Sequence, residues 1–97
     1  MNEIEHLLSV VGEEGAEVTQ AASKANRFGL MDGYPNTDRT NAGDLLKEFA
    51  QLEAVIEMLE ERGALTRDPD QHAADKAAKK RKVEQFMAYA RDMGTLV

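Results

Sequence analysis

The sequence predicts an all-α protein built from three long helices. Apolar residues recur at spacings of three and four along most of the chain, and no alternating β-branched run is present. Ala, Leu, Glu, Lys and Met dominate, and all five favour helices. The 97 residues are 42% hydrophobic but only 5% aromatic, which suits aliphatic seams between helices. This length leaves no room for a second core, so we expect residues 1–97 to form a single domain.

A first helix is expected from about Asn2 to Arg27. Asn2 is a suitable N-cap, and Glu3 and Glu5 are favourably placed near the positive end of the helix dipole. Gly29 fits a left-handed position just after the helix. The apolar face of this helix consists of Ile4, Leu7, Leu8, Val11, Val18, Ala21, Ala22 and Ala25.

Residues 29–40 form a connector rich in turn-forming residues, and so long a loop in a small domain is usually functional or mobile. Thr40 or Asn41 should cap a second helix that continues to about Arg62 and stops at Gly63. Its seam, with alternating steps of four and three, is Leu45, Phe49, Leu52, Ile56 and Leu59.

Asp68 and Pro69 should open a third helix, as N-cap and first helical residue, and this helix should end near Met93. Its apolar face is Val83, Phe86, Met87 and Ala90. A helix as long as the first, ~39 Å, exceeds the width of a compact domain of this size. We therefore expect a four-helix core shared between subunits, in a homodimer or homotetramer.

The net charge of −6 is spread unevenly, with −8 on residues 1–65 and +2 on residues 66–97. An acidic chain is a poor non-specific binder of nucleic acid, so no nucleic-acid partner is expected. The exception is a basic run, either a solvated helix face or a contact for the phosphates of a small anion: Lys76, Lys79, Lys80, Arg81 and Lys82.

Neither a membrane span nor a signal peptide is recognisable, so no membrane partner is expected. The absence of cysteine excludes a disulfide scaffold, a thiolate zinc site and a catalytic thiol. A cytoplasmic protein is the simplest interpretation, in the host cytoplasm if the protein is viral.

Carboxylates border the apolar faces of the first two helices. Glu14 and Glu17 lie one turn apart on the first helix, and Glu13 flanks them. On the second helix Asp44, Glu48 and Gln51 form one row. If the two helices pack antiparallel, these oxygen ligands converge near the middle of the bundle.

Carboxylates beside a core are costly unless they are paired, and a divalent cation between them removes that cost. Oxygen ligands without Cys or His favour Mg²⁺ or Mn²⁺ over zinc. Such an ion suits the attack of water on a phosphoanhydride. The alternative is that Glu13 and Glu14 are surface acids and that Glu48 pairs with a lysine.

Candidate substrate contacts follow the acids. Lys24 shares a face with Glu17 and can reach phosphates that a metal ion holds, whereas Arg27 either reaches phosphates or caps its own helix. Asn41 is a candidate for contact with the ligand, or it only packs against its neighbours. The loop aromatics Phe28 and Tyr34 carry the same two alternatives, and the single histidines His6 and His72 are expected on the surface.

The pattern EExxE in the first helix, followed by LLKEFAQLEAVIEML in the second, resembles the MazG-like all-α nucleoside triphosphate pyrophosphohydrolases. The motif of that family is EExxE and then ExxD, on two helices of a four-helix bundle. The segment Ala22–Leu30, which contains Arg-Phe-Gly, and the end of the third helix are similar to small, phage-type members. The resemblance covers nearly the whole chain.

The resemblance implies that Glu14, Glu17 and Glu48 hold the metal ion. Glu13 then matches the first acid of the motif and holds or orients the attacking water, as general base. One position departs from the pattern, because Gln51 stands where the family has Asp. Asp44, one turn before Glu48, is a candidate for the missing carboxylate.

The activity implied is Mg²⁺- or Mn²⁺-dependent cleavage of a nucleoside triphosphate between the α and β phosphates, giving a monophosphate and pyrophosphate. The sequence does not indicate which base or sugar is preferred. The alternative, supported by Gln51, is a catalytically weak helical dimer that binds nucleotide or acts as a regulatory module.

Overall fold

A computed structural model describes residues 1–97 and contains three helices: α1 (Glu3–Phe28), α2 (Asn41–Glu61) and α3 (Pro69–Asp92). There is no β-strand, only an isolated antiparallel bridge between Gly33 and Thr40, so the predicted all-α class is confirmed. The contacts divide the chain into two compact units, Met1–Leu65 and Thr66–Val97. The expectation of a single domain stays a prediction.

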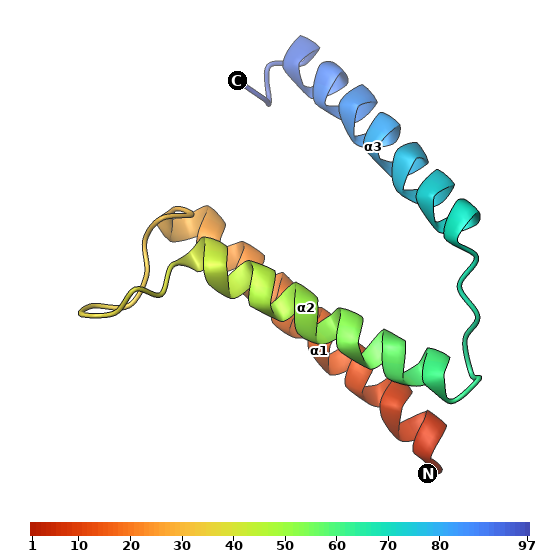
Figure 1. Ribbon diagram of the computed structural model, residues 1–97. Coiled ribbons are helices and arrows are strands. Elements are labelled where there is room, and N and C mark those ends of the chain that lie inside the picture. Colours follow the sequence, from red (N-terminus) through yellow and green to blue (C-terminus); the bar gives the residue numbers. More distant parts are fainter. The chain divides into compact units, whose positions relative to one another are not determined.

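The first unit is a hairpin in which α1 and α2 lie side by side in opposite directions (Figure 1). Its core consists of the buried side chains of Leu7, Val55 and Leu59, and the Leu59 side chain is fully enclosed. Partly buried apolar side chains surround these three: Ile4, Val10, Val11 and Met58. The core thus lies where the start of α1 meets the end of α2.

The face of α2 that packs on α1 differs from the predicted seam at one step. Val55 is buried, whereas Phe49, which the predicted seam included, is 53% exposed. In a helix of 3.6 residues per turn, Val55 falls on the same side as Leu52 and Leu59, while Phe49 turns away towards the 70%-exposed Leu46. The predicted register was therefore wrong at Phe49.

The helix ends agree with the predicted caps. The Asn2 side chain accepts from the backbone N–H of Glu5 at 2.8 Å, and the Thr40 hydroxyl accepts from that of Gly43 at 3.0 Å. Gly29 has φ 97° and ψ 150°, so its φ is positive as expected but its ψ is extended rather than left-handed helical. The extended ψ leads the chain away into the connector instead of wrapping it around the helix end.

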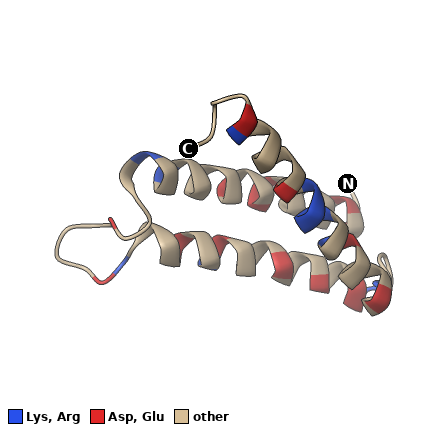
Figure 2. Cartoon of the chain, turned by 90° about the horizontal axis from the view of Figure 1, so that it is seen from above, with Lys and Arg blue, Asp and Glu red and all other residues tan.

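The second unit contains α3, which begins after the N-cap Asp68 and has Pro69 as its first residue, as predicted. The Asp68 carboxylate accepts from the backbone N–H groups of Asp70 and Gln71, at 2.9 and 3.3 Å. No residue of α3 is buried, and its basic run is exposed (Figure 2). None of the helices combines the length and hydropathy needed to cross a membrane.

Candidate functional site

A polar cleft of about 260 Å³ lies at the connector end of the α1–α2 hairpin. Three segments line it: one face of α1, the connector, and the first two turns of α2. The lining residues are Glu17, Gln20, Ala21, Lys24, Tyr34, Arg39, Asn41, Asp44 and Glu48. Three carboxylates, one ammonium and one guanidinium thus share a single small space, with a formal charge of −1.

Helical periodicity explains which helix residues reach the cleft. Glu17 and Lys24 are seven residues apart on α1, which is two turns on one face. Asn41, Asp44 and Glu48 repeat at three and four on α2 and form the facing row. The predicted row of acids on α2 is therefore present up to Glu48.

The base of the connector is fixed to the start of α2, and the loop beyond it projects from the end of the hairpin (Figure 1). The backbone N–H of Asn41 donates to the carbonyl of Asp32 at 2.7 Å, and that of Ala42 donates to Leu30 at 2.9 Å. The backbones of Gly33 and Arg39 approach so closely that a Cβ at position 33 would lie 1.7 Å from the Arg39 carbonyl oxygen. Only glycine fits there.

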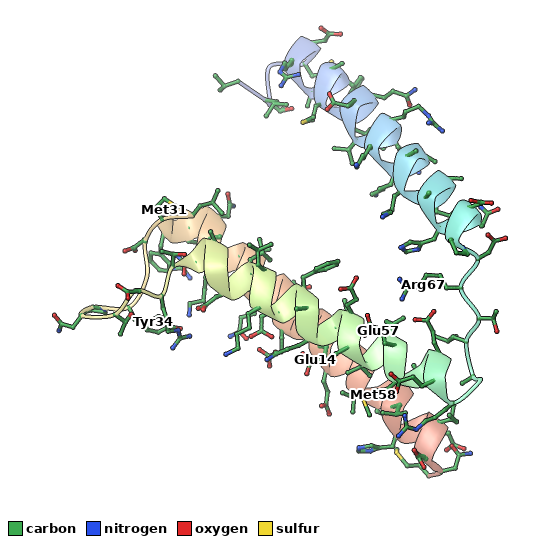
Figure 3. All side chains as sticks on the ribbon, viewed as in Figure 1. Glu14, Met31, Tyr34, Glu57, Met58 and Arg67 are labelled. Carbon is green, nitrogen blue, oxygen red and sulfur yellow. The ribbon has the colours of Figure 1, made fainter.

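A tight turn at the tip of the connector carries Tyr34 into the cleft lining. Pro35 and Asn36 are its central residues, and Asn36 has φ 61°, the left-handed conformation that asparagine tolerates. Thr37 closes the turn, because both its backbone N–H and its hydroxyl donate to the Tyr34 carbonyl, at 3.3 and 2.9 Å. The labelled Tyr34 in Figure 3 accordingly lies in the connector rather than on a helix.

Two cations contact the Tyr34 ring. The Lys24 ammonium lies 5.0 Å from the ring centroid and donates to the phenol oxygen at 2.8 Å. The Arg39 guanidinium lies 4.0 Å from the same centroid. Both contacts are within the range of cation–π attraction. The hydrogen bond from Lys24 lowers the pKa of the Tyr34 phenol, with a further contribution from the charge of Lys24.

Arg39 also forms an ion pair with Asp44. Its Nη2 atom lies 3.2 and 3.4 Å from the two carboxylate oxygens. The hydrogen bonds to Asp44 raise the pKa of the guanidinium. The Arg39 side chain is 56% exposed and that of Asp44 is 21% exposed. The pair therefore stands at the mouth of the cleft, where it is partly screened by solvent.

Glu17 and Glu48 line the cleft without forming a hydrogen bond or an ion pair. Half-buried Glu14, one turn before Glu17, has its Oε2 atom shielded from solvent with no hydrogen-bond partner (labelled in Figure 3). A shielded acceptor of this kind is costly unless a cation or a donor approaches it. No three acidic or histidine side chains in the chain come close enough together to share one ion.

The carboxylates of the cleft are of the donor type that a hard divalent cation prefers. Carboxylate oxygens are the ligands that Mg²⁺ and Mn²⁺ prefer, and such an ion needs only a few protein ligands besides water and substrate oxygens. Of the three predicted ligands, Glu17 and Glu48 line the cleft with no partner, whereas Glu14 lies one turn earlier on α1 and is not part of the lining. Asp44 is the one acid of the cleft that already has a cationic partner.

Several predicted site residues do not line the cleft. Glu13 is exposed on α1, and Gln51 is exposed on α2, where half-buried Leu52 continues the inner face in its place. Arg27 is exposed too, and its guanidinium lies 5.0 Å from the ring of Phe28. Asn41 does line the cleft, but it is buried, and its side-chain amide donates to the Gly29 carbonyl at 2.9 Å.

Sequence reasoning missed Arg39 and Gln20 as cleft residues. Arg39 is the only base within the connector, residues 29–40, and it directly precedes the N-cap of α2. This position was the signal in the sequence that could have indicated a role for Arg39. A single basic residue just before a helix that carries a row of acids is close enough to pair with one of them. Gln20 offered none beyond its place between Glu17 and Lys24.

None of the protein-family models, curated proteins or solved structures compared with this chain matches it. Glu17 is the residue of the EExxE motif that lines the cleft.

Proposed function

We propose that the protein is a metal-dependent nucleoside triphosphate pyrophosphohydrolase that cleaves between the α and β phosphates. The observation that carries this proposal is the joint lining of one cleft by unpaired carboxylates and by two cations. A triphosphate with its metal ion carries both kinds of charge, so its recognition needs both kinds of residue. The EExxE pattern and its resemblance to the MazG-like enzymes support this choice of reaction.

Glu17 and Glu48 are proposed to hold Mg²⁺ or Mn²⁺, together with Glu14. The shielded Oε2 atom of Glu14 supports its inclusion, because a bound cation would satisfy that oxygen. Asp44, which faces the same cleft, takes the place of the family carboxylate that Gln51 lacks. Mg²⁺, when bound, supplies positive charge beside the phosphate oxygens and the leaving pyrophosphate.

Lys24 is proposed to bind a phosphate oxygen of the substrate. Its ammonium already lies at the cleft wall, 2.8 Å from the Tyr34 phenol, and it has further donors to offer. Exposed Glu13 is accessible to water and is proposed as the general base that orients the attacking molecule. Arg27 and Asn41 remain candidates for substrate contact at the connector end of the hairpin.

The active form is proposed to be a homodimer or homotetramer with a MazG-like four-helix core shared between subunits. The exposed apolar side chains on the first unit support this: Leu8, Leu46 and Phe49. On α3, Phe86 is 61% exposed. A sedimentation mass above 10.7 kDa at micromolar concentration is expected, and a mass equal to the single chain would contradict it.

The test is product analysis by ³¹P nuclear magnetic resonance, with ribo- and deoxynucleoside triphosphates and Mg²⁺. Monophosphate and pyrophosphate are expected. Glu17→Gln and Glu48→Gln should each abolish the release of pyrophosphate. Glu57→Gln, which changes an exposed acid on α2, should not. Formation of phosphate and a diphosphate would refute the proposed bond, and full activity of both cleft variants would refute the proposed metal site.

A second candidate, a helical module that binds nucleotide without turnover, is favoured by one observation. No three acids of this chain are grouped closely enough to share an ion. Binding of a nucleoside triphosphate with no release of pyrophosphate at any Mg²⁺ or Mn²⁺ concentration would identify this second function.

A further inference from the structure

Arg39 is the one cleft residue that contacts both an acid and an aromatic ring. Its guanidinium pairs with Asp44 at 3.2 Å and lies 4.0 Å from the Tyr34 ring centroid. The backbone of Arg39 is fixed within the connector, because its N–H donates to the side-chain hydroxyl of Thr37 at 3.3 Å. The residue is therefore held in position at the cleft mouth while its side chain stays 56% exposed.

The pairing with Asp44 has two consequences for ligands. While Arg39 neutralises Asp44, that carboxylate is not free to bind a cation, and the guanidinium is not free to bind an anion. A guanidinium binds phosphate oxygens as readily as carboxylate oxygens, with two parallel hydrogen bonds. A half-exposed ion pair is weak, so stronger partners can replace it on both sides.

We propose that Arg39 exchanges partners: it neutralises Asp44 in the ligand-free cleft and moves to the phosphates of a polyphosphate when a divalent cation binds Asp44. The inference rests on the proposed function in taking a polyphosphate as the anion and a divalent metal ion as the cation. A cation on Asp44 releases Arg39 for the anion, and an anion on Arg39 releases Asp44 for the cation. The cation and the anion therefore favour each other's binding. In the ligand-free position the Tyr34 ring face attracts the guanidinium of Arg39.

The experiment is a double-mutant cycle in which calorimetry measures the binding of inorganic tripolyphosphate to the full chain without divalent ions. Asp44→Asn removes the competitor for Arg39 and should tighten tripolyphosphate binding by about five- to tenfold. In the Arg39→Gln background the same change should gain about twofold at most, since only general repulsion is then relieved. Arg39→Lys keeps the charge but loses the paired donors. In the Arg39→Lys background, the gain in tripolyphosphate affinity from Asp44→Asn should therefore lie between the gains in the other two backgrounds.

The second arm measures Mn²⁺ binding without any anion. Arg39→Gln should tighten Mn²⁺ binding several-fold, because Asp44 is then unpaired. Arg62→Gln is the matched control, since Arg62 pairs with Glu3 at the other end of the hairpin, and it should leave Mn²⁺ binding unchanged. Circular dichroism verifies that every variant keeps its helices.

Equal gains from Asp44→Asn in both backgrounds would overturn the inference, as would equal effects of Arg39→Gln and Arg62→Gln on Mn²⁺ binding. Absence of tripolyphosphate binding to every variant would overturn it too. None of these measurements involves turnover. If the coupling is found but no nucleotide releases pyrophosphate, the proposed reaction fails and the exchange by Arg39 stands.

Discussion

The two ends of the α1–α2 hairpin use the same kind of ion pair in different surroundings. At one end Arg62 pairs with Glu3, and its Nη1 atom also donates to the backbone carbonyl of Met58 at 3.1 Å. At the other end Arg39 pairs with Asp44 beside the Tyr34 ring. The first pair borders the apolar core, whereas the second borders a polar cleft.

The buried core and the proposed binding cleft therefore lie at opposite ends of one hairpin. The Arg62 end contains the buried Leu7, Val55 and Leu59, and the end of α2 is closed by the backbone N–H of Ala64, which donates to Leu59 at 3.0 Å. The cleft end buries little besides Asn41 and two alanines. Changes in the core should therefore act on folding, and changes in the cleft on binding.

The largest effect on stability is expected from Leu59→Ala, because this side chain is 0% exposed. Truncation of a fully buried leucine leaves a cavity, so the free energy of unfolding should fall by roughly 3 kcal/mol. Met31→Ala, at a connector side chain that is 79% exposed, is the control and should cost less than about 1 kcal/mol. Urea denaturation at a fixed protein concentration measures both, and equal losses would contradict this division of the hairpin.

A smaller change in stability, of opposite sign, is expected at Glu14, which lies on α1 between the two ends of the hairpin. Glu14→Gln removes a charge from a position where one oxygen is shielded and has no partner, so without metal the protein should gain about 1 kcal/mol. For a chain of this size the midpoint Tm would rise by about 4–8 °C. Differential scanning calorimetry in the presence of a chelator tests this.

The matched control is Glu13→Gln on the exposed side of the same turn, which should leave Tm unchanged. Added Mn²⁺ should then raise the Tm of the unmodified chain more than that of Glu14→Gln. A lower Tm for Glu14→Gln than for Glu13→Gln without metal would show that the shielded oxygen has a partner in solution.

The smallest effect concerns the proton of Tyr34. The hydrogen bond from Lys24 lowers the pKa of this phenol below its ordinary value of 10.0. Since the lower pKa belongs to the folded chain, the resulting stability is fully present above pH 10.0 and is lost as the pH falls through the lowered pKa. Ultraviolet titration of a Tyr89→Phe protein follows Tyr34 alone, because the chain has two tyrosines.

In that background Lys24→Gln should move the titration of Tyr34 towards higher pH. Lys47→Gln, an exposed lysine on α2, is the control and should leave the curve in place. Identical curves for all three proteins would mean that Lys24 does not donate to the phenol in solution.

The sequence predicts most of the local structure, because helix ends depend on nearby residues. Asn2, Thr40 and Asp68 each have a short polar side chain that accepts from the first turn, and each caps its helix. The core register is less determined. Phe49 and Val55 are both apolar, and only the packing of α1 against α2 selects between them.

The cleft, too, contains residues that the sequence predicts and residues that it does not. Glu17, Lys24, Asp44 and Glu48 follow from helical spacing and were predicted as site residues. Arg39 was not, because its position depends on contacts between residues that sequence patterns do not relate. The hydrogen bond from Asn41 to Asp32 and the close approach of Gly33 to the Arg39 backbone are examples.

The short backbone ladder at the base of the connector also has a kinetic consequence. Two main-chain hydrogen bonds, from Asn41 to Asp32 and from Ala42 to Leu30, close the loop that carries Tyr34 and Arg39. Breaking this ladder frees both side chains together, so the connector opens as one cooperative segment. The residence time of a ligand held by these two side chains would then follow the opening rate of the main chain, which amide hydrogen exchange at Asn41 and Ala42 reports.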